Sequence, residues 1–597
     1  MSYRTKKLIS NPEDVVTECI EGMVETYPGL QYLDGFPNIK VVLRADVSGS
    51  TYDKVAVISG GGSGHEPAHA GYVGEGMLTA AVCGDIFTSP PIDSILAAIR
   101  AVTGPMGCLL IVKNYTGDRL NFGLAAEEAK AEGYLVEMVI VGDDCALPPA
   151  RGGVGRRGLA GTILVHKVAG AAAAAGLSLA DVTAEAKHAS EVVGTMGVAF
   201  SVCTLPGHFP SDRIGPGLME LGLGIHGEPG ADVADLQPAD VVVSHVLKQI
   251  LSTETQYVPI RRGNRVVLMI NGLGATTVME LMIASGKAVP QLQLEHGLAV
   301  DRVYTGVFMT SLDMAGFSIS LMRADHIILQ RLDAPTKAPS WPVGTEGDRP
   351  PAKIPVPLQP SRIETNEKTQ LLSQPHELSE QGRVIEAAIE AAANALISSR
   401  DQLNEWDHKV GDGDCGTTMF RGATAVLEDM KKCYPLNDVA RTINEIGTSI
   451  RRVMGGTSGI LYEILCKAAY ANLKGSPDVT SKHLAKALEA AIAAVSKYGG
   501  ASSGHRTMLD ALIPAAAALN EGLDAGDDPV TSFVLSAEAA WRGAELTKNM
   551  QAQAGRSSYV SAEILVSAPD PGAMAVATWY RAAALAVESK LRLIQIE

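Results

Sequence analysis

The 597-residue sequence lacks the features of a secreted or membrane-spanning protein. Its eight cysteines are thinly spread and form no CxxC pair, which favours a reducing compartment. No uninterrupted apolar run approaches the roughly 18 residues that a membrane helix needs. The first residues turn acidic before any apolar stretch appears, unlike a secretory signal. We therefore expect a cytoplasmic protein.

Positive charge is also scarce. The chain has 50 Lys and Arg residues against 66 Asp and Glu residues, a formal net charge of -16. Nucleic acids and anionic membranes require a concentrated basic surface, so we expect neither as a partner. An anionic substrate would have to be held by local features, such as the backbone N–H groups of helix starts.

Changes in composition predict a multidomain protein. Residues 1–335 alternate short β-rich runs with Ala- and Leu-rich segments, which predicts an α/β domain. Residues 336–376 are dense in proline and lack an apolar period, as is typical of an extended linker. Residues 377–597 are alanine-rich with apolar residues at three- and four-residue steps, which predicts an all-α bundle or barrel.

Three aspartates stand close together in WDHKVGDGDCGTTM, at Asp407, Asp412 and Asp414. Such carboxylates repel one another unless a cation neutralises them, and oxygen ligands suit Mg²⁺ bridging to phosphates. An EF-hand fits poorly, because Thr418 stands where its glycine belongs and Ala423 where its final glutamate belongs. The alternative is a solvated acidic turn.

Glycine turns open into helical sequence at MGGTSGIL, residues 454–461, and at DPGAM, residues 570–574. Free N–H groups and the hydroxyls of Thr457 and Ser458 could cradle an anion there, although such turns are more often merely helix starts. Neither half contains GxxxxGK[ST], and GGGSGHEP has a histidine in place of the P-loop lysine. The sequence therefore argues against a P-loop NTPase.

In the N-terminal half, polar residues follow predicted strands on glycine loops. GGGSGHEP carries His65, NYTGD carries Asp118, and GIHGEPG holds His226 between glycines with Pro229 close behind. A histidine and an aspartate at neighbouring strand ends could polarise a carbonyl and accept a hydroxyl proton. The structural alternatives are a buried histidine at 65 and a helix-capping aspartate at 118.

These motifs resemble those of the ATP-dependent dihydroxyacetone kinases of the single-chain triokinase type, over nearly the whole chain. The likeness of the first half to their substrate-binding domain lies in GGGSGHEPAHAGYVGEGML, IVKNYTGD, GRRGLAGT, GIHGEPG, NGLGATT and TSLDMAGFS. The likeness of the second half to their nucleotide-binding domain lies in KVGDGDCGTTM, GGTSG, RTMLDAL and GRSSYV. The resemblance implies an α/β substrate-binding domain, an all-α nucleotide-binding domain, and a homodimer.

The resemblance also implies roles in the first half. His226 would bond covalently to the substrate carbonyl as a hemiaminal, Asp118 would accept the proton of the attacking hydroxyl, and His65 would assist it. Adduct formation would select ketones and aldehydes over polyols such as glycerol. The implied substrate contacts are Gly62, Ser63, Gly64, His65, Lys113, Asp118 and His226.

In the second half the resemblance implies that Asp407, Asp412 and Asp414 bind the Mg²⁺ that clamps the phosphates of ATP. Arg556 is a candidate for stabilising transferred charge or, equally, a solvated arginine. One departure is His505, where an aspartate commonly precedes RTM. The implied nucleotide contacts are Asp414, Cys415, Gly416, Thr417, Thr457, Ser458, Arg506, Thr507, Met508, Arg556, Asp570, Pro571 and Gly572.

Transfer of the ATP γ-phosphate to dihydroxyacetone and to glyceraldehyde is the activity that the resemblance implies. Some members also split FAD into AMP and cyclic FMN, with Mn²⁺ in place of Mg²⁺, and the sequence leaves this second activity open. Some animal members inhibit innate-immune sensors, which could only be an additional role here. A phosphotransferase relay is disfavoured, because such systems keep the two halves as separate subunits.

Overall fold

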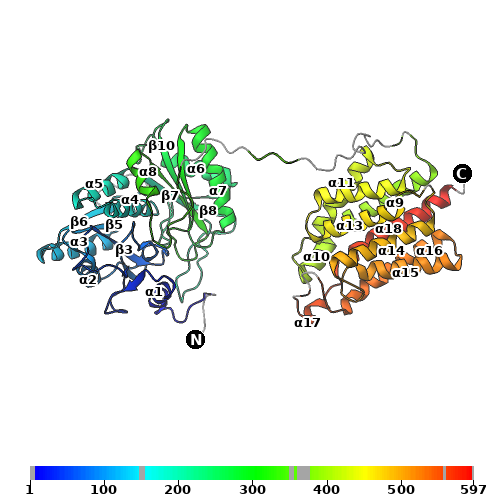
Figure 1. Ribbon diagram of the computed structural model, residues 1–597, viewed down its shortest axis with the longest axis horizontal. Helices are drawn as coiled ribbons and strands as arrows, with labels where there is room; N and C mark the ends of the chain where they lie inside the picture. Colours follow the sequence, from blue (N-terminus) through cyan, green and yellow to red (C-terminus); the bar gives the residue numbers. More distant parts are fainter. Residues whose placement is uncertain are drawn as a thin grey trace. The chain divides into compact units, whose positions relative to one another are not determined.

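The computed structural model describes residues 7–146, 155–347, 355–359, 375, 377–476, 478–554, 558 and 560–594. The chain forms two compact units, Met1–Val356 and Pro357–Glu597 (Figure 1). The first is an α/β unit and the second is helical, as the sequence predicts. No helix among the described residues is long and apolar enough to cross a membrane.

The first sheet of the N-terminal unit is mostly parallel. Its strand order is β1-β2-β4-β3-β5-β6, in which β3 pairs parallel with β4 and β5, and β5 with β6. The central strands are buried on both faces, which explains their continuous apolar runs. The strands are β1 (Leu30–Tyr32), β2 (Val41–Arg44), β3 (Ala56–Ser63), β4 (Ala80–Ile86), β5 (Cys108–Lys113) and β6 (Val136–Val141).

Helices cover both faces of this sheet. Ile58 and Leu110 pack with α2 and α3 on one face, while Val57 and Leu109 pack with α4 and α5 on the other. This alternation is what the two-residue period of a strand dictates. The helical elements are α1 (Val15–Thr26), η1 (Ala70–Tyr72), α2 (Ile92–Val102), α3 (Thr116–Ala131), α4 (Thr162–Ala174) and α5 (Leu179–Glu191).

The second sheet has the order β11-β10-β12-β7-β8-β9. β10 pairs parallel with β11, whereas β12, β7, β8 and β9 follow in antiparallel pairs. Val267 and Met269 of β10 belong to the same core as Val57 of the first sheet, so the two sheets share one interior. The elements are β7 (Val193–Ala199), β8 (Leu218–Leu221), β9 (Asp232–Asp235), α6 (Ala239–Ile250), β10 (Arg265–Gly272), α7 (Val278–Pro290), η2 (Gln291–Glu295), β11 (Ala299–Gly306), β12 (Gly316–Arg323) and α8 (His326–Asp333).

The chain leaves the N-terminal unit later than its composition indicates. Residues 336–341 were predicted to begin the linker, yet they pack on this unit. Lys337 donates its backbone N–H to the carbonyl of Glu75, and Ser340 donates to that of Gly71. Trp341 is buried against Tyr304, with ring centroids 4.8 Å apart. Proline content alone does not reveal these long-range contacts.

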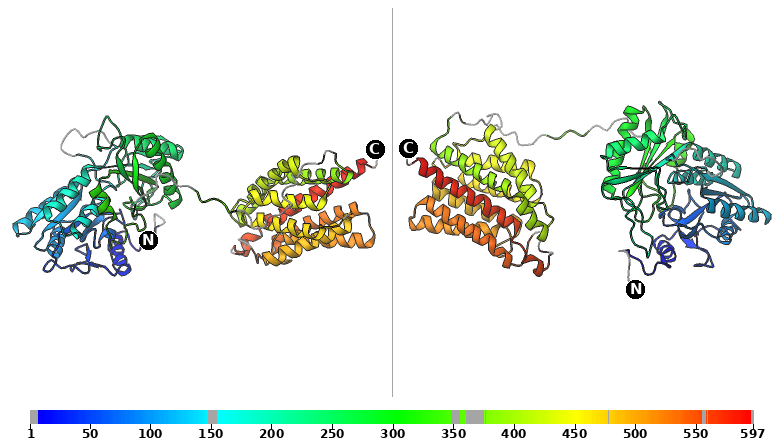
Figure 2. Two further views of the ribbon diagram at one scale, coloured as in Figure 1. Left: turned by 45° about the horizontal axis from the view of Figure 1, so that its top comes forward. Right: turned by 180° about the vertical axis from the view of Figure 1, so that it is seen from behind.

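The helices of the C-terminal unit run roughly along one direction (Figures 1 and 2), and their contacts close into a ring. Contacts connect α9 to α11, then α12, α13, α14, α15, α16 and α18 in turn, and α18 packs back on α9. The helical elements are α9 (Glu380–Ser398), α10 (Arg400–Val410), α11 (Cys415–Cys433), α12 (Val439–Val453), α13 (Gly456–Leu473), α14 (Ser481–Gly499), α15 (Leu509–Ala525), α16 (Pro529–Leu546), η3 (Thr547–Asn549), α17 (Ala562–Leu565) and α18 (Pro571–Ile594).

Inside this ring lies an apolar cavity of about 790 Å³, lined among others by Leu396, Ile443, Leu488 and Trp579. Alternate connections of an up-and-down ring lie at the same end. The turns after α10, α12, α14 and α16 are therefore at one end. Those predicted nucleotide residues that the structure describes lie in or beside these turns.

Gly170 in α4 offers a test of the packing in the N-terminal unit. A Cβ atom at this position would lie 2.3 Å from the Cα atom of Met77. We predict that Gly170→Ala lowers the free energy of unfolding by about 1–3 kcal/mol or more through overpacking. Gly22→Ala in α1 is the matched control, because no atom lies within 4 Å of its added Cβ. Urea unfolding of both variants measures the difference, and equal stabilities would contradict this packing.

Candidate active site

Two parallel neighbours place polar side chains at one edge of the first sheet. β3 leads into the loop that carries His65, while β5 ends at Lys113 and Asp118 lies in the first turn of α3. Because β3 and β5 are parallel, their carboxyl ends meet. A Cβ atom on Gly61 would lie 3.1 Å from Lys113 Nζ and 3.4 Å from an Asp118 carboxylate oxygen. The glycine loop, the ammonium and the carboxylate therefore share one small region.

The glycine loop itself is held rigidly. A Cβ atom on Gly62 would lie 2.6 Å from the backbone nitrogen of Thr88, so no side chain fits there. Gly64 has a φ of +99° and donates its N–H to the Glu66 carboxylate at 3.0 Å. The Ser63 hydroxyl donates to the carbonyl of Gly84 at 2.7 Å. The side chain of Ser63 is thus used by the fold, and its backbone is what the loop can offer to a ligand.

His65 is fully buried and carries a free lone pair. Its Nδ1 donates to the carbonyl of Thr310 at 2.8 Å, so Nε2 is the unprotonated nitrogen, and Nε2 has no hydrogen-bond partner. Burial, followed by electrostatic interactions with Lys113 and His226, lowers the pKa of His65 well below its usual value. His65 is therefore a neutral hydrogen-bond acceptor at physiological pH.

Beside His65 and His226, Lys113 Nζ and the hydroxyl of Tyr115 are also buried without a hydrogen-bond partner. Lys113 is 1% exposed, and burial lowers its pKa although Asp118, Glu66 and Asp143 oppose the shift. Buried polar groups are nearly always hydrogen-bonded in native proteins. Three such atoms in one region indicate a site built for a small polar ligand.

His226 lies in the loop after β8, beside these groups. Its ring centroid is 4.9 Å from that of His65, 5.1 Å from that of Phe87 and 4.8 Å from that of Tyr115. The side chain is 24% exposed, so a ligand can reach it. The predicted residues Gly62 to His65, Lys113, Asp118 and His226 are thus brought together by two loops and two strand ends.

Sequence reasoning missed four neighbours of this site. Tyr115 and Glu228 stand inside the quoted motifs NYTGD and GIHGEPG, so a signal for them existed. Phe87, which stacks on His65, and Ser89, whose hydroxyl donates to Asp118, follow β4 in a stretch without any motif. Only the fold shows that this stretch packs on the glycine loop.

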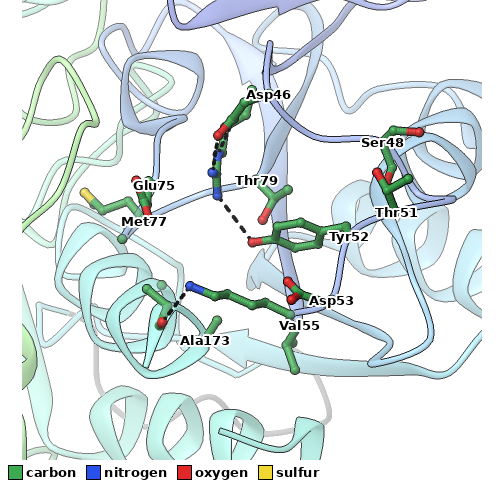
Figure 3. Close-up of a pocket in the computed structure, with 15 residues that line it drawn as sticks. Asp46, Ser48, Thr51, Tyr52, Asp53, Val55, Glu75, Met77, Thr79 and Ala173 are labelled. Atoms are coloured by element: carbon green, nitrogen blue, oxygen red, sulfur yellow. Dashed lines mark hydrogen bonds and ion pairs between the residues drawn. The ribbon is translucent and has the colours of Figure 1, made fainter. Parts of the chain in front are cut away.

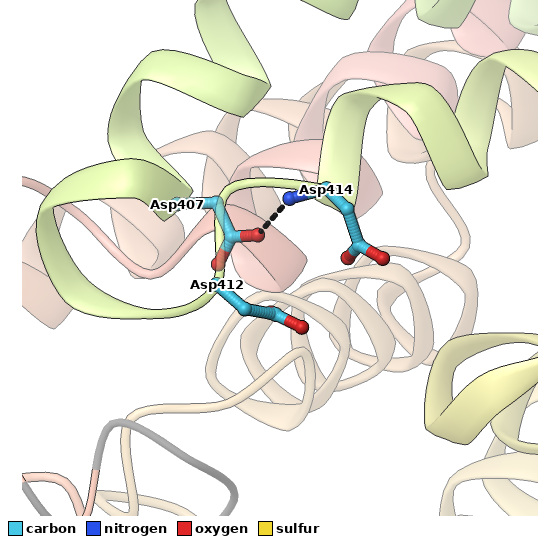
Figure 4. A group of neighbouring side chains, drawn as sticks. All are labelled: Asp407, Asp412 and Asp414. Carbon is cyan, nitrogen blue, oxygen red and sulfur yellow. Dashed lines mark hydrogen bonds between the residues drawn. The ribbon is translucent and has the colours of Figure 1, made fainter. Parts of the chain in front are cut away.

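The carboxylates of Asp407, Asp412 and Asp414 gather at the turn between α10 and α11 (Figure 4). One ligand oxygen from each lies within 4.8 Å of the others. Asp407 is fixed by accepting the backbone N–H groups of Asp414 and Cys415, both at 2.9 Å. The carboxylates of Asp412 and Asp414 are exposed. An all-oxygen group with open positions fits a hard divalent cation such as Mg²⁺.

The start of α11 adjoins this cluster. Gly416 is required there, since its Cβ would lie 1.9 Å from the carbonyl oxygen of Arg400. Thr417 is held by Asn404, which donates to its hydroxyl at 2.9 Å and accepts its backbone N–H at 3.0 Å. Thr457 is exposed and Ser458 half-buried at the start of α13, next to Gly455 and Gly456, which both have positive φ.

Arg506 faces the interior. Its side chain is buried, and its guanidinium donates to the carbonyls of Thr547, Leu565 and Ala568 at 3.1, 3.0 and 2.6 Å. These bonds fix the segment that leads to Asp570. Arg506, predicted among the nucleotide contacts, thus supports the loop at this end of the ring.

Asp570 begins α18 as its capping residue, accepting the N–H of Ala573 at 2.8 Å. Pro571 and Gly572 follow as the first residues of the helix. Burial raises the pKa of Asp570 to about 6; Ala573 and Arg506 oppose this shift, and the charges of Asp510 and Asp407 add to it. Asp570 is therefore electrostatically coupled to Asp407 of the carboxylate cluster.

The segment 502–510 completes this end of the ring. His505 accepts the backbone N–H of Ser502 at 3.4 Å and donates to its hydroxyl at 3.0 Å, so the departure from the usual aspartate stabilises a turn. Thr507 donates its N–H to Asp510 at 2.9 Å, and Met508 is buried. Arg556 lies outside the described residues.

A separate polar cavity of about 250 Å³ lies at the opposite end of β3 (Figure 3). Arg44 donates to Asp46 at 3.0 and 2.7 Å and to the hydroxyl of Tyr52 at 3.3 Å. Lys54 donates to the carbonyl of Ala174 at 2.9 Å. Arg44 and Lys54, the cationic side chains of this cavity, thus already have partners within the protein, and we assign no function to the cavity.

Comparison with known proteins agrees with this architecture. Residues 21–340 match the Dak1 domain model and residues 409–585 match the DAK2 domain model. A protein of Solanum lycopersicum named "Putative 3,4-dihydroxy-2-butanone kinase" is 77% identical over 592 residues, covering 99% of each chain. The "Triokinase/FMN cyclase" of Homo sapiens is 41% identical over 588 residues, covering 97% of this chain and 98% of its own.

Among solved structures, the dihydroxyacetone kinase of C. freundii in complex with AMP-PNP and Mg²⁺ is 38% identical with a TM-score of 0.65. The match covers 97% of this chain and 99% of that one. Fold and site thus define a kinase that joins a Dak1 domain to a DAK2 domain. The chain belongs to the dihydroxyacetone kinase family.

The raised pKa of Asp570 predicts a pH dependence of stability. Between about pH 4, where an unfolded aspartate titrates, and about pH 6, the folded state holds a proton that the unfolded state releases. Stability therefore falls as the pH rises through this window, by about 3 kcal/mol at about 1.4 kcal/mol per pKa unit. Asp570→Asn should remove this dependence.

The pH dependence of the unfolding free energy of the C-terminal unit is measured by urea unfolding at several pH values, without nucleotide or divalent cations. Asp401→Asn, at an aspartate whose side chain is 94% exposed, is the control. Parallel curves for the wild type and Asp570→Asn would show that Asp570 is not the group responsible.

Proposed function

We propose that the chain transfers the γ-phosphate of ATP to dihydroxyacetone and to glyceraldehyde, with the substrate carbonyl held covalently on His226. The observation that carries this proposal is the partly exposed His226 ring beside three buried polar atoms without partners: His65 Nε2, Lys113 Nζ and the Tyr115 hydroxyl. A small hydroxylated carbonyl compound could satisfy such atoms. The relatives named for kinases of dihydroxyacetone and of 3,4-dihydroxy-2-butanone support the same class, since both compounds are α-hydroxy ketones.

In the proposed reaction, an imidazole nitrogen of His226 adds to the carbonyl carbon and fixes the substrate in one orientation. Asp118 then accepts the proton of the hydroxyl that attacks the phosphate. Neutral His65 can accept a hydrogen bond from a substrate hydroxyl, and Lys113 can donate one to an oxygen. A polyol without a carbonyl cannot form the bond to His226, which makes that bond a source of specificity.

We further propose that the ring end of the C-terminal unit binds ATP. Asp407, Asp412 and Asp414 would hold Mg²⁺, which neutralises phosphate charge when bound. The start of α11, the turn at Thr457 and Ser458, and residues 506–508 and 570–572 would surround the nucleotide. The AMP-PNP and Mg²⁺ complex of the C. freundii enzyme supports this assignment.

A second activity, the cleavage of FAD into AMP and cyclic FMN, is favoured by the full-length similarity to proteins named triokinase/FMN cyclase. The same carboxylates would then hold Mn²⁺, another cation that oxygen ligands suit. Attack by a ribityl hydroxyl resembles attack by a triose hydroxyl. We also propose that the protein is a cytoplasmic homodimer, in which the nucleotide unit of one protomer can serve its own or its partner's substrate unit.

His226→Ala tests the covalent anchor. Loss of the bond to the carbonyl removes the positioning of the hydroxyl, so kcat/KM for dihydroxyacetone should fall by about 100-fold or more. Coupled detection of ADP, with dihydroxyacetone, glyceraldehyde and glycerol run in parallel, measures both activity and specificity. The wild type should use the two carbonyl compounds and not glycerol. A fully active variant would refute the role of His226.

Asp412→Asn tests the shared metal site. Because cation stabilisation of phosphate charge is worth several kcal/mol, kinase activity with Mg²⁺ should fall by about 100-fold or more. Cyclic FMN formation from FAD with Mn²⁺ should fall equally if both reactions use this cluster. Asp401→Asn, at an exposed aspartate of the preceding helix α10, is the control. A wild type that forms no cyclic FMN would remove the second activity and leave the kinase intact.

A further inference from the structure

The GIHGEPG loop is shaped around the carboxylate of Glu228. Oε2 of Glu228 accepts the backbone N–H of His226 at 2.9 Å, and Oε1 lies 3.8 Å from His226 Nδ1. A Cβ atom on Gly224 would lie 1.8 Å from Oε1, so any side chain there would displace the carboxylate. Gly227 has a φ of +77°, which returns the chain toward the histidine. The glycines of the motif therefore make room for Glu228.

A second layer holds Glu228 in place. Arg157 Nη1 lies 3.5 Å from Glu228 Oε1, while Nε and Nη2 of the same guanidinium donate to Asp144 and to the carbonyl of Gly222, both at 2.7 Å. Asp144 is buried and Arg157 is largely so. Charges of alternating sign thus lead from the interior to His226.

Glu228 is ionised in this position. Burial alone would raise its pKa, but contacts with His226 and Arg157 hold the pKa at about 2. The other groups facing the His226 ring are His65, Phe87 and Tyr115, with Lys113 behind His65. Of these, the neutral His65 presents its ring to His226, and Tyr115 packs at a ring angle of 85°. The carboxylate of Glu228, with Oε1 3.8 Å from Nδ1, is the charged group on the Nδ1 side of the ring.

We propose that Glu228, held by Arg157, is a positioning residue that keeps the proton of His226 on Nδ1 and so leaves the Nε2 lone pair for the substrate carbonyl. This inference rests on the proposed covalent role of His226. The Nε2 lone pair forms the C–N bond while the C=O π pair moves to oxygen, which takes a proton from water. The ring is then an imidazolium, whose Nδ1 proton faces Glu228; release of that proton to the hydroxide formed restores a neutral ring.

Glu228→Gln tests this role with little change of size. A glutamine can donate its amide to Nδ1, which favours the opposite tautomer, with the proton on Nε2. Nitrogen-15 NMR of the histidine rings in the full-length, ligand-free protein, with His226→Ala to assign the signal, reports the tautomer. We expect Nδ1–H in the wild type, Nε2–H in Glu228→Gln, and Nδ1–H restored in part by Glu228→Asp.

The second measurement is carbon-13 NMR of dihydroxyacetone labelled at its carbonyl, which shows a tetrahedral carbon when the adduct forms. In Glu228→Gln the adduct population and kcat/KM should fall by at least about tenfold, the lower end for carboxylates that orient metal-ligating histidines. Thermal protection by ATP and Mg²⁺ should be unchanged. Glu254→Gln, at an exposed glutamate of the same unit, should match the wild type.

Two outcomes separate this inference from the function on which it rests. A wild-type tautomer together with wild-type activity in Glu228→Gln would overturn the role of Glu228. Absence of a tetrahedral carbon in the wild type would instead refute the covalent adduct, while the tautomer measurement would still decide whether Glu228 orients His226.

Discussion

The parallel pairing of β3 with β5 is the constraint on which the N-terminal unit depends. It brings the glycine loop, Lys113 and Asp118 to one edge and buries there an amine and an imidazole nitrogen, Lys113 Nζ and His65 Nε2, that have no hydrogen-bond partner. Such groups are costly in a folded interior. The surrounding core, which joins both sheets, must compensate for this cost. The buried polar atoms of the site therefore lower the stability of the folded unit, and they remain free to form hydrogen bonds with a ligand.

The C-terminal unit reaches a comparable result by a different route. Its helices close into a ring, and alternate connections fall at one end, so turns that are widely separated in sequence become neighbours. The proposed nucleotide site depends on the backbone geometry of these turns and on a few buried side chains that hold them in place. Arg506 exemplifies this, because it holds three carbonyls that fix the approach to Asp570. An acidic chain can in this way prepare a site for phosphates without a surplus of lysine.

Much of this organisation can be predicted from the sequence, because it depends on local patterns. The two fold classes follow from the periods of the apolar residues, and the acidic cluster at Asp407, Asp412 and Asp414 follows from its short spacing. Contacts between residues far apart in the sequence cannot be predicted from such local patterns. The motif RTM does not reveal that Arg506 turns inward, nothing around Phe87 signals its stacking on His65, and the proline content near Trp341 masks its burial. Glu228 stands in the GIHGEPG motif, but only the structure shows that its carboxylate lies near Nδ1 of His226.

The apolar cavity inside the helical ring makes the two units of the chain differ in their expected response to hydrostatic pressure. When an apolar cavity of about 790 Å³ holds neither water nor ligand, it is eliminated as the helices separate, and unfolding of this unit would then reduce the volume of the system. The N-terminal unit, whose sheets share a closely packed interior, has less to gain from compression. Under that condition, hydrostatic pressure would act selectively within one polypeptide and would open the helical unit before it disturbed the α/β unit.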